Sequence, residues 1–276
     1  MIIRNSLALV WVAVGLCATA RGAEAFQDFR HKTFDNMAFR LVGRNAERLI
    51  TPTDKGLLIR LPSHDGNNEA VGVALRAVVR GNFEITASFE VVKVDKPQSD
   101  GVGAGMLLEF DSPQKDAITL ERFLMPDGTE TFTSTKITEV NGEKNYEPRR
   151  VPAQAKSGKF RMVRTDQTVE VYYADGDGEY QLLRSEQLGT GDVGLVRVAA
   201  DSLYTEYGVV LLLRDFGIRA DELVDRSSIK RTSTAWLPIA FVVLVLVPLI
   251  IFGAWTVMSR RSTPISSSKK PPPPRM

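Results

Sequence analysis

Hydrophobic and polar residues alternate along much of the chain between residues 26 and 231. In residues 83–91 (FEITASFEV) the odd positions are apolar and the even positions carry Glu, Thr or Ser. This alternation is typical of a β-strand that buries one face and exposes the other. Residues 131–136 and 169–173 alternate in the same way. Further short runs predict strands at Leu57–Leu61, Ala70–Val79, Val102–Phe110, Ala117–Leu124, Lys159–Arg164, Tyr180–Ser185, Val193–Ala200 and Gly208–Arg219.

Turn sequences separate these runs. They include Pro-Asp-Gly at 126–128, Asn-Gly at 141–142 and the glycine-rich stretches 175–178 and 189–192. Such residues favour tight turns because they adopt backbone conformations that other residues avoid. About a dozen short strands without a convincing amphipathic helix predict an all-β sandwich or closed barrel.

Several of these strands carry a resemblance to a known superfamily. Residues 102–111 (VGAGMLLEFD) and 118–122 (ITLER) resemble the paired central strands of concanavalin A-like lectin/glucanase modules. The segments 160–164, 169–173, 180–183 and 209–220 resemble the later strands of those modules. The match covers most of residues 26–225 and is similar to a bacterial family of exported domains with no assigned function. It implies a concanavalin A-like jelly roll, a fold that hosts many different functions.

Two apolar segments flank this domain. The first runs from Leu7 to Ala20 after the basic Arg4, and it leads to Ala-Glu-Ala at 23–25. This order predicts a signal peptide over residues 1–25, cleaved before Phe26, although an uncleaved N-terminal anchor has similar features. The extracytoplasmic jelly-roll domain is then expected over residues 26–231.

The second segment, residues 236–258, contains no charged residue. As a helix, 23 residues reach about 34 Å, which exceeds the roughly 30 Å hydrocarbon core of a membrane. A transmembrane helix is therefore predicted here, followed by a basic, proline-rich tail over residues 259–276. The basic tail and the export signal together predict a single-pass type I membrane protein with a cytoplasmic tail.

Charge and cysteine content narrow the choice of function. Without the tail and the signal peptide, 28 basic and 32 acidic residues remain, so an electrostatic basis for nucleic-acid binding is absent. The only cysteine, Cys17, lies in the signal peptide. The mature chain therefore has no thiol nucleophile and no disulfide, and we expect no cofactor.

Catalytic carboxylates are the first candidate chemistry. Glucanases of the resembled superfamily carry acids on alternate residues of one strand, as Glu-x-Asp-x-Glu or Glu-x-Asp-x-x-Glu. Glu109 and Asp111 have the first spacing, but Pro113 and Gln114 occupy the positions of the third acid. Glu121 on the following strand is an alternative partner. Two solvent-facing acids at a strand end are the more common reason for such a pattern, and we favour that interpretation.

Saccharide binding is the second candidate. Aromatic rings stack on sugars, yet all three tryptophans lie outside the domain, one in the signal peptide and two within the predicted span. Strand parity places Tyr172 with Glu170 on the face opposite Val171, and Arg161 on a neighbouring strand is expected to share that face. We therefore predict Arg161, Glu170 and Tyr172 as ligand-binding residues. The alternative is a cross-strand ion pair between Arg161 and Glu170.

A calcium site is the third candidate. Asp175, Asp177 and Glu179 present alternating carboxylates in a glycine-rich loop, but the complete calcium-loop pattern is absent. Asp-Gly repeats are also typical of tight hairpins, so we predict a hairpin and no metal site.

These observations favour a membrane-tethered, non-catalytic binding module for envelope glycans or a protein partner. The alternatives are a glycoside hydrolase that uses Glu109 and Asp111, and a scaffold subunit of an envelope complex.

Overall fold

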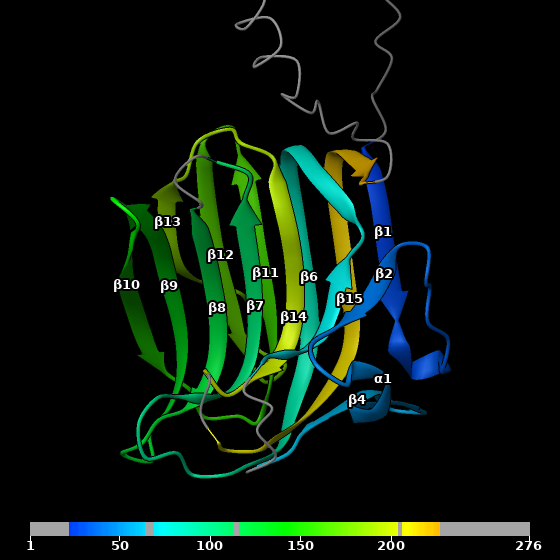
Figure 1. Ribbon diagram of the computed structural model, residues 1–276, viewed down its shortest axis with the longest axis vertical. Helices are drawn as coiled ribbons and strands as arrows, with labels where there is room; N and C mark the ends of the chain where they lie inside the picture. The colour runs from blue at the N-terminus through cyan, green and yellow to red at the C-terminus, as the bar shows by residue number, and fades with distance from the viewer. Residues whose placement is uncertain (1–21, 64–68, 113–115, 204–205, 227–276) are drawn as a thin grey trace, which may run out of the picture. The chain divides into compact units, whose positions relative to one another are not determined.

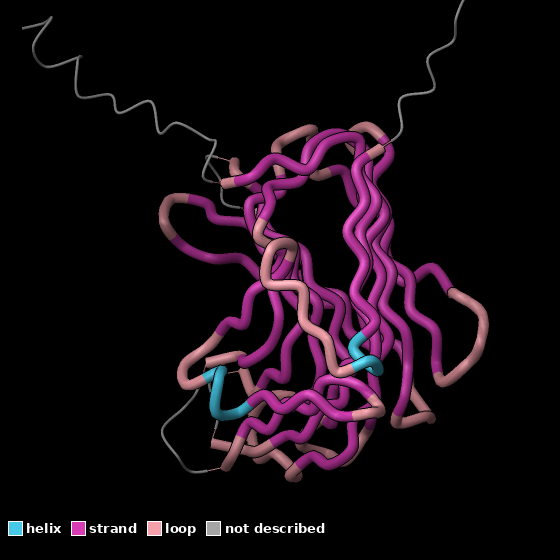
Figure 2. Tube along the Cα trace, turned by 90° about the vertical axis from the view of Figure 1, so that its right-hand side faces the viewer, coloured by secondary structure: helices cyan, strands magenta, loops and turns pink. Residues whose placement is uncertain are grey.

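β-Strands dominate the computed structural model, which describes residues 22–63, 69–112, 116–203 and 206–226. All the pairings that join the described strands are antiparallel. The hydrogen-bonded network folds into two stacked layers, which are seen in Figure 1 and from the side in Figure 2. The predicted all-β jelly roll is thereby confirmed for the described part of the chain.

We name each layer after its central strand. In the β14 layer the order is β2 (Phe39–Val42), β5 (Val71–Leu75), β14 (Val193–Asp201), β7 (Val102–Phe110), β8 (Ala117–Leu124), β9 (Glu130–Val140) and β10 (Glu143–Pro152). In the β6 layer the order is β13 (Gln181–Gln187), β12 (Thr168–Asp175), β11 (Ser157–Thr165), β6 (Ala77–Val94) and β15 (Val209–Asp225). Beyond β15 lie β1 (Ala23–Asp28) along one half, and β4 (Gly56–Leu61) with β3 (Ile50–Thr53) along the other. Two short helices, η1 (Phe29–His31) and α1 (Ala46–Leu49), complete the described elements.

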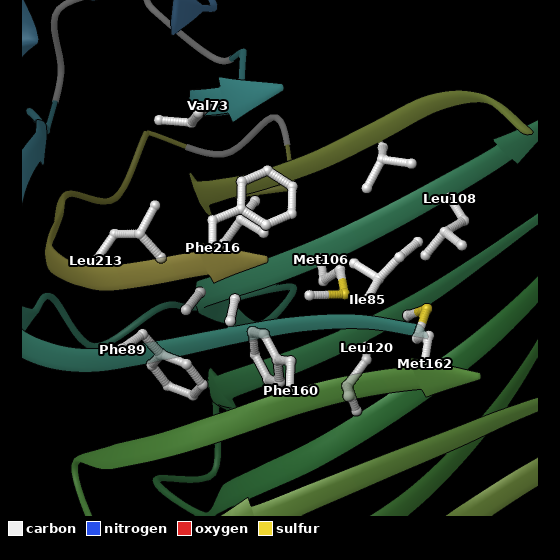
Figure 3. Packing of buried hydrophobic residues seen from close by; sticks show 14 of the residues in the cluster. Val73, Ile85, Phe89, Met106, Leu108, Leu120, Phe160, Met162, Leu213 and Phe216 are labelled. Carbon is white, nitrogen blue, oxygen red and sulfur yellow. The ribbon is translucent and has the colours of Figure 1, made fainter. Parts of the chain in front are cut away.

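The core lies between the layers and is built from the apolar half of each alternating strand. Figure 3 shows Phe89 and Phe160 of the β6 layer beside Met106 and Leu120 of the β14 layer. The Phe89 and Phe160 ring centroids are 4.3 Å apart. Because every second residue points inward, the remaining residues form two separate outer faces, one on each layer.

Buried arginines occupy the rims of the core. Arg164 donates hydrogen bonds to the carbonyl oxygens of Gly81 and Gly191, and its guanidinium lies 4.9 Å from the centroid of the Phe83 ring. A buried guanidinium is costly unless its donors find acceptors. Here it ties the start of β6 to the loop before β14, so it fixes the relative position of the two layers at that rim.

The structure corrects one predicted strand. The run predicted over Ala70–Val79 is interrupted at Arg76, whose backbone N–H and side-chain Nε donate to the carbonyl oxygens of Ala38 and Phe39. β5 ends before this residue, and β6 begins after it and continues through the predicted strand at 83–91. The first part of the predicted strand is therefore β5 of the β14 layer. Its last residues join the predicted strand at 83–91 to form β6 of the other layer, so the chain changes layer at Arg76.

Within the described residues, no helix is long and apolar enough to cross a membrane. The span predicted at residues 236–258 and the tail at 259–276 lie outside those residues, as does most of the predicted signal peptide. Ala23, Glu24 and Ala25 form the first half of β1 and pair with β15. Cleavage before Phe26 would shorten β1 to its second half.

Candidate functional site

The outer face of the β14 layer brings two carboxyl groups together over a strip of glycines. Gly105 of β7 pairs with Glu121 of β8, and Gly103 of β7 pairs with Asp201 of β14. Side chains that are paired across antiparallel strands lie on the same face. Glycine has no side chain, and the neighbouring strand β8 uses the space over Gly103: a Cβ atom there would lie 3.1 Å from the Phe123 ring. We call Glu121 and Asp201 the acid pair.

The acid pair spans β7 diagonally. Two strand spacings of about 4.8 Å and a stagger of two residues place the two Cα atoms about 12 Å apart. The charge of Asp201 contributes to raising the pKa of Glu121, as expected for acids that face one another.

Glu121 is nearly inaccessible, with 8% of its surface exposed. Burial raises the pKa of its carboxyl to about 8, and the Asp201 charge adds to that rise, while a hydrogen bond with Thr119 and the charge of Arg150 oppose it. A carboxyl group with such a pKa is mostly protonated at neutral pH and can donate a hydrogen bond.

Asp201 lies at the end of β14 in a different environment. Burial raises the pKa of its carboxyl, and Arg197 and the Leu203 N–H act in the opposite direction. The Leu203 N–H donates to Oδ1 at 2.8 Å, and the Arg197 guanidinium lies 3.7 Å from Oδ2. These partners oppose the effect of burial on Asp201, as Thr119 and Arg150 do on Glu121, and the net shift of the Asp201 pKa is upward.

This arrangement has a definite chemical capacity. Two carboxyl groups with raised pKa values on the same face offer hydrogen-bond donors and acceptors to a hydroxyl-rich ligand. A pair of carboxyl groups, one of them protonated near neutral pH, is also what glycosidic bond cleavage requires.

The structure separates the acids that the sequence grouped. Glu109 lies on the same outer face as Glu121 but four residues further along β7, about 13 Å away in the strand direction. Asp111 follows the end of β7, and its carboxylate occupies the space beside Gly194 where a Cβ atom would stand. Glu109, Asp111 and Glu121 do not meet at one point.

The predicted ligand residues Arg161, Glu170 and Tyr172 lie on the outer face of the β6 layer. The Arg161 guanidinium lies 5.3 Å from the Tyr172 ring centroid and 5.5 Å from that of Tyr180. Its ion pair is with Glu84 of β6 at 2.7 Å, rather than with Glu170. Glu170 instead accepts a hydrogen bond from the Tyr172 hydroxyl at 2.8 Å.

The glycine-rich loop after β12 connects two antiparallel strands, β12 and β13. The Asp175 carboxylate accepts the backbone N–H groups of Gln154 and Ala155 at 2.8 and 2.9 Å, so it anchors the segment before β11. Across the described ranges, no three acidic, histidine or cysteine side chains gather as a metal site.

Sequence reasoning missed Asp201 as a partner for Glu121. The two residues are 80 positions apart, and only the strand order β8-β7-β14 makes them neighbours. One signal was present in the sequence, because Gly103 and Gly105 occupy alternate positions of an otherwise apolar strand. A strand whose outer face lacks side chains leaves room for a ligand or for neighbouring side chains.

Three solved structures of carbohydrate-active or carbohydrate-binding proteins are similar to this chain in fold. A Bacteroides ovatus mixed linkage glucan GH16 protein in complex with a G4G4G3G product aligns with a TM-score of 0.50 at 9% identity, over 70% of this chain and 99% of that one. A putative beta-glucanase from Mycobacterium abscessus aligns with a TM-score of 0.47 at 12% identity, over 70% of this chain and 98% of the other. The carbohydrate binding module CBM66 from Bacillus subtilis has a TM-score of 0.42 at 12% identity, over 66% and 96% of the two chains.

The first of these likenesses shows a shared concanavalin A-like fold, and at such low identity it shows the fold alone. None of the curated proteins matches the chain. A family model does match it, over residues 18–235. The chain therefore belongs to the family described as "Protein of unknown function (DUF1583) C domain".

Proposed function

We propose that this domain is a non-catalytic saccharide-binding module whose primary site is the outer face of the β14 layer around the acid pair. The observation that carries the proposal is the placement of Glu121 and Asp201 on either side of the glycine strip on β7. Saccharide hydroxyls both donate and accept hydrogen bonds, and a protonated carboxyl such as that of Glu121 can do both in return.

The partners of Asp201 favour binding over catalysis. Both of its carboxylate oxygens have a neighbouring donor, the Leu203 N–H and the Arg197 guanidinium. A nucleophile or general base needs a lone pair directed at its target and free of strong competing donors. A carboxylate held in this way is well placed to accept a hydroxyl hydrogen bond in a fixed geometry.

Hydrolysis of a glycosidic bond is the second candidate. Burial keeps Glu121 protonated near neutral pH, which is the state of a general acid, and Asp201 is the nearest acid on the same face. In this candidate mechanism, Glu121 protonates the leaving oxygen and Asp201 activates a water molecule. The catalytic pair is then Glu121 and Asp201 rather than Glu109 and Asp111.

One experiment separates the two functions. The purified full-length protein is incubated with a panel of neutral and acidic polysaccharides, and both retention and released oligosaccharides are measured. The variants are Glu121→Gln and Asp201→Asn, with Glu109→Gln as the control on the same face. For a binding module we expect retention without cleavage, weakened by the first two changes and unaffected by the control.

Cleavage that either variant abolishes would establish the hydrolase instead. The absence of both retention and cleavage would contradict a saccharide function and favour the scaffold alternative. Circular dichroism of each variant confirms that the β-sheet fold is intact.

We also propose that the domain is tethered outside the cytoplasm by the apolar segment at residues 236–258. Its uncharged length of 23 residues supports this. Protease treatment of intact and permeabilised cells tests the orientation: the domain is expected to be digested from outside, while an epitope on the tail survives until permeabilisation. Recovery of the protein in the soluble fraction would contradict the tether.

A further inference from the structure

The outer face of the β6 layer carries a straight row of side chains that the acid pair does not involve. Direct cross-strand pairs connect Phe26 to Gly217, Gly217 to Thr86, Thr86 to Arg161, Arg161 to Tyr172, and Tyr172 to Leu182. The row crosses β1, β15, β6, β11, β12 and β13. We call these six residues the platform row; five strand spacings of about 4.8 Å make it about 24 Å long.

Both ends of the platform row expose apolar surface. Phe26 is 58% exposed and Leu182 is 55% exposed, although both belong to strands whose inward residues are packed in the core. Single exposed apolar residues are common, but here two mark the ends of one row that also contains Tyr172. Aromatic and aliphatic groups aligned in this way are a candidate binding surface.

Gly217 gives Phe26 its position. A Cβ atom at residue 217 would lie 2.9 Å from the Phe26 ring and 3.3 Å from the Thr86 hydroxyl. The ring therefore lies over the glycine, in the space that a side chain would fill. One side of the ring rests on the sheet, which leaves the other side to the solvent.

At the middle of the row, the Arg161 guanidinium lies close to two tyrosine rings. Its distances to the centroids of Tyr172 and Tyr180 are 5.3 and 5.5 Å, within the range of cation–π attraction. Glu84 holds the guanidinium from the β6 side at 2.7 Å. These contacts fix the long arginine side chain against the sheet, so the centre of the row is pre-organised and polar.

Charges beside the platform row are balanced locally. Asp28 pairs with Arg30 and Glu84 pairs with Arg161, each at 2.7 Å. Glu170 accepts the Tyr172 hydroxyl, and Asp215 accepts the Ser88 hydroxyl at 3.0 Å. No excess of positive charge gathers along the described row, so an anionic polymer or an anionic lipid surface finds no electrostatic attraction.

We propose that the platform row is a second binding site, which takes an uncharged linear polysaccharide laid across the strands. Such a chain presents alternating apolar C–H faces and hydroxyl edges along an extended line. The apolar faces match Phe26, Tyr172 and Leu182, and the hydroxyl edges match Thr86 and Arg161. The site lies on the layer opposite the acid pair and does not depend on it.

The test measures retention of the purified full-length protein by insoluble cellulose, and its mobility in gels that contain mixed-linkage glucan, glucomannan or alginate. Phe26→Ser and Tyr172→Ser each remove one stacking surface and are expected to weaken binding to the neutral polymers about tenfold, with the double variant weaker still. Phe26→Trp is expected to preserve or strengthen binding. Tyr146→Ser is the matched control, because Tyr146 is 57% exposed on the other layer.

The acid-pair variants distinguish this proposal from the first. Glu121→Gln and Asp201→Asn are expected to leave cellulose retention unchanged, so failure at one site is visible separately from failure at the other.

The proposal is overturned if no neutral polymer retains the protein, or if the Tyr146→Ser control loses as much binding as the platform-row variants. It is also overturned if alginate retards the protein more than glucan does, or if only the acid-pair variants lose retention. Two further measurements identify a different occupant. A dimer that Phe26→Ser converts to a monomer would assign the row to a second copy of the chain, and co-sedimentation with phosphatidylglycerol vesicles would assign it to a membrane.

Discussion

Replacing Glu121 by glutamine should make the protein more stable at neutral and alkaline pH. The glutamine side chain has nearly the shape of the protonated carboxyl and cannot ionise. In the wild-type protein the carboxyl is buried beside Asp201, which raises its pKa from 4.5 to about 8. Folding must therefore keep a proton on this group, or bury a charge, at pH values where the unfolded chain has already released the proton.

The size and sign of the effect follow from linkage. Between pH 4.5 and pH 8 the folded state binds more protons than the unfolded state, so the free energy of unfolding falls as pH rises. Each unit of separation between the two pKa values corresponds to about 1.4 kcal/mol. At pH 7 the raised pKa of Glu121 lowers the free energy of unfolding by about 3 kcal/mol, and above pH 8 it lowers it by about 5 kcal/mol. Below pH 4.5 it vanishes.

The measurement is urea denaturation of wild-type protein and Glu121→Gln at pH values from 5 to 8, followed by far-ultraviolet circular dichroism. We expect the two stabilities to be similar at pH 5 and to diverge by about 3 kcal/mol at pH 7, less the value of one lost hydrogen bond of about 1 kcal/mol. Glu109→Gln, on the exposed end of the same face, serves as the control and should follow the wild type. Parallel curves for Glu121→Gln and wild type at all pH values would refute the reasoning, because they would mean that Glu121 ionises in the folded protein as easily as in the unfolded chain.

Three further predictions concern the rest of the chain. Arg164→Ala should lower the free energy of unfolding by about 2–4 kcal/mol, because it removes the hydrogen bonds to the Gly81 and Gly191 carbonyl oxygens and a buried side chain packed on Phe83. Arg219→Ala at the exposed surface should change it by less than about 0.5 kcal/mol in the same denaturation assay. N-terminal sequencing of the exported protein should begin at Phe26, and retention of Met1 in the membrane fraction would disprove cleavage. Thermal unfolding monitored with and without dithiothreitol should give the same melting temperature, since Cys17 is the only cysteine, and a shift would point to a disulfide between copies.

The strands that bury one full face were predictable from sequence. Residues 83–91 and 169–173 alternate because the inter-layer core accepts only their apolar halves, so the pattern carries the structural information directly. β10 (Glu143–Pro152) is different. It is exposed along nearly its whole length, carries charges and prolines, and forms the outer edge of its layer. Charges and prolines on an edge strand discourage it from pairing with another chain, and the strand buries no face of its own. Its sequence therefore shows no alternation of hydrophobic and polar residues.

The candidate sites depend on strand order, which alternation alone does not determine. The sequence placed Arg161 and Tyr172 on one face because β11 and β12 are consecutive, and they do pair directly. Asp201 reaches Glu121 only because β7 lies between β14 and β8, and Phe26 reaches Thr86 only through β15. Such non-local neighbours follow from the jelly-roll topology. They leave at most an indirect trace in sequence, such as the glycines at 103, 105 and 217 that make room for them.

The period of two that builds the core also keeps the two proposed sites apart. A β-strand offers its outward residues to one layer face only, so the acid pair and the platform row point in opposite directions from the shared core. A ligand on one face cannot contact the other without passing around an edge of the sandwich. Two independent faces on one domain can therefore link two polysaccharide chains, or two segments of one chain, and each added contact raises the effective concentration at the other face. If both sites bind, a variant at one site should lose a much larger factor in binding to a polymer network than in binding to short oligosaccharides. If only one site binds, the losses on polymer and on oligosaccharide should agree.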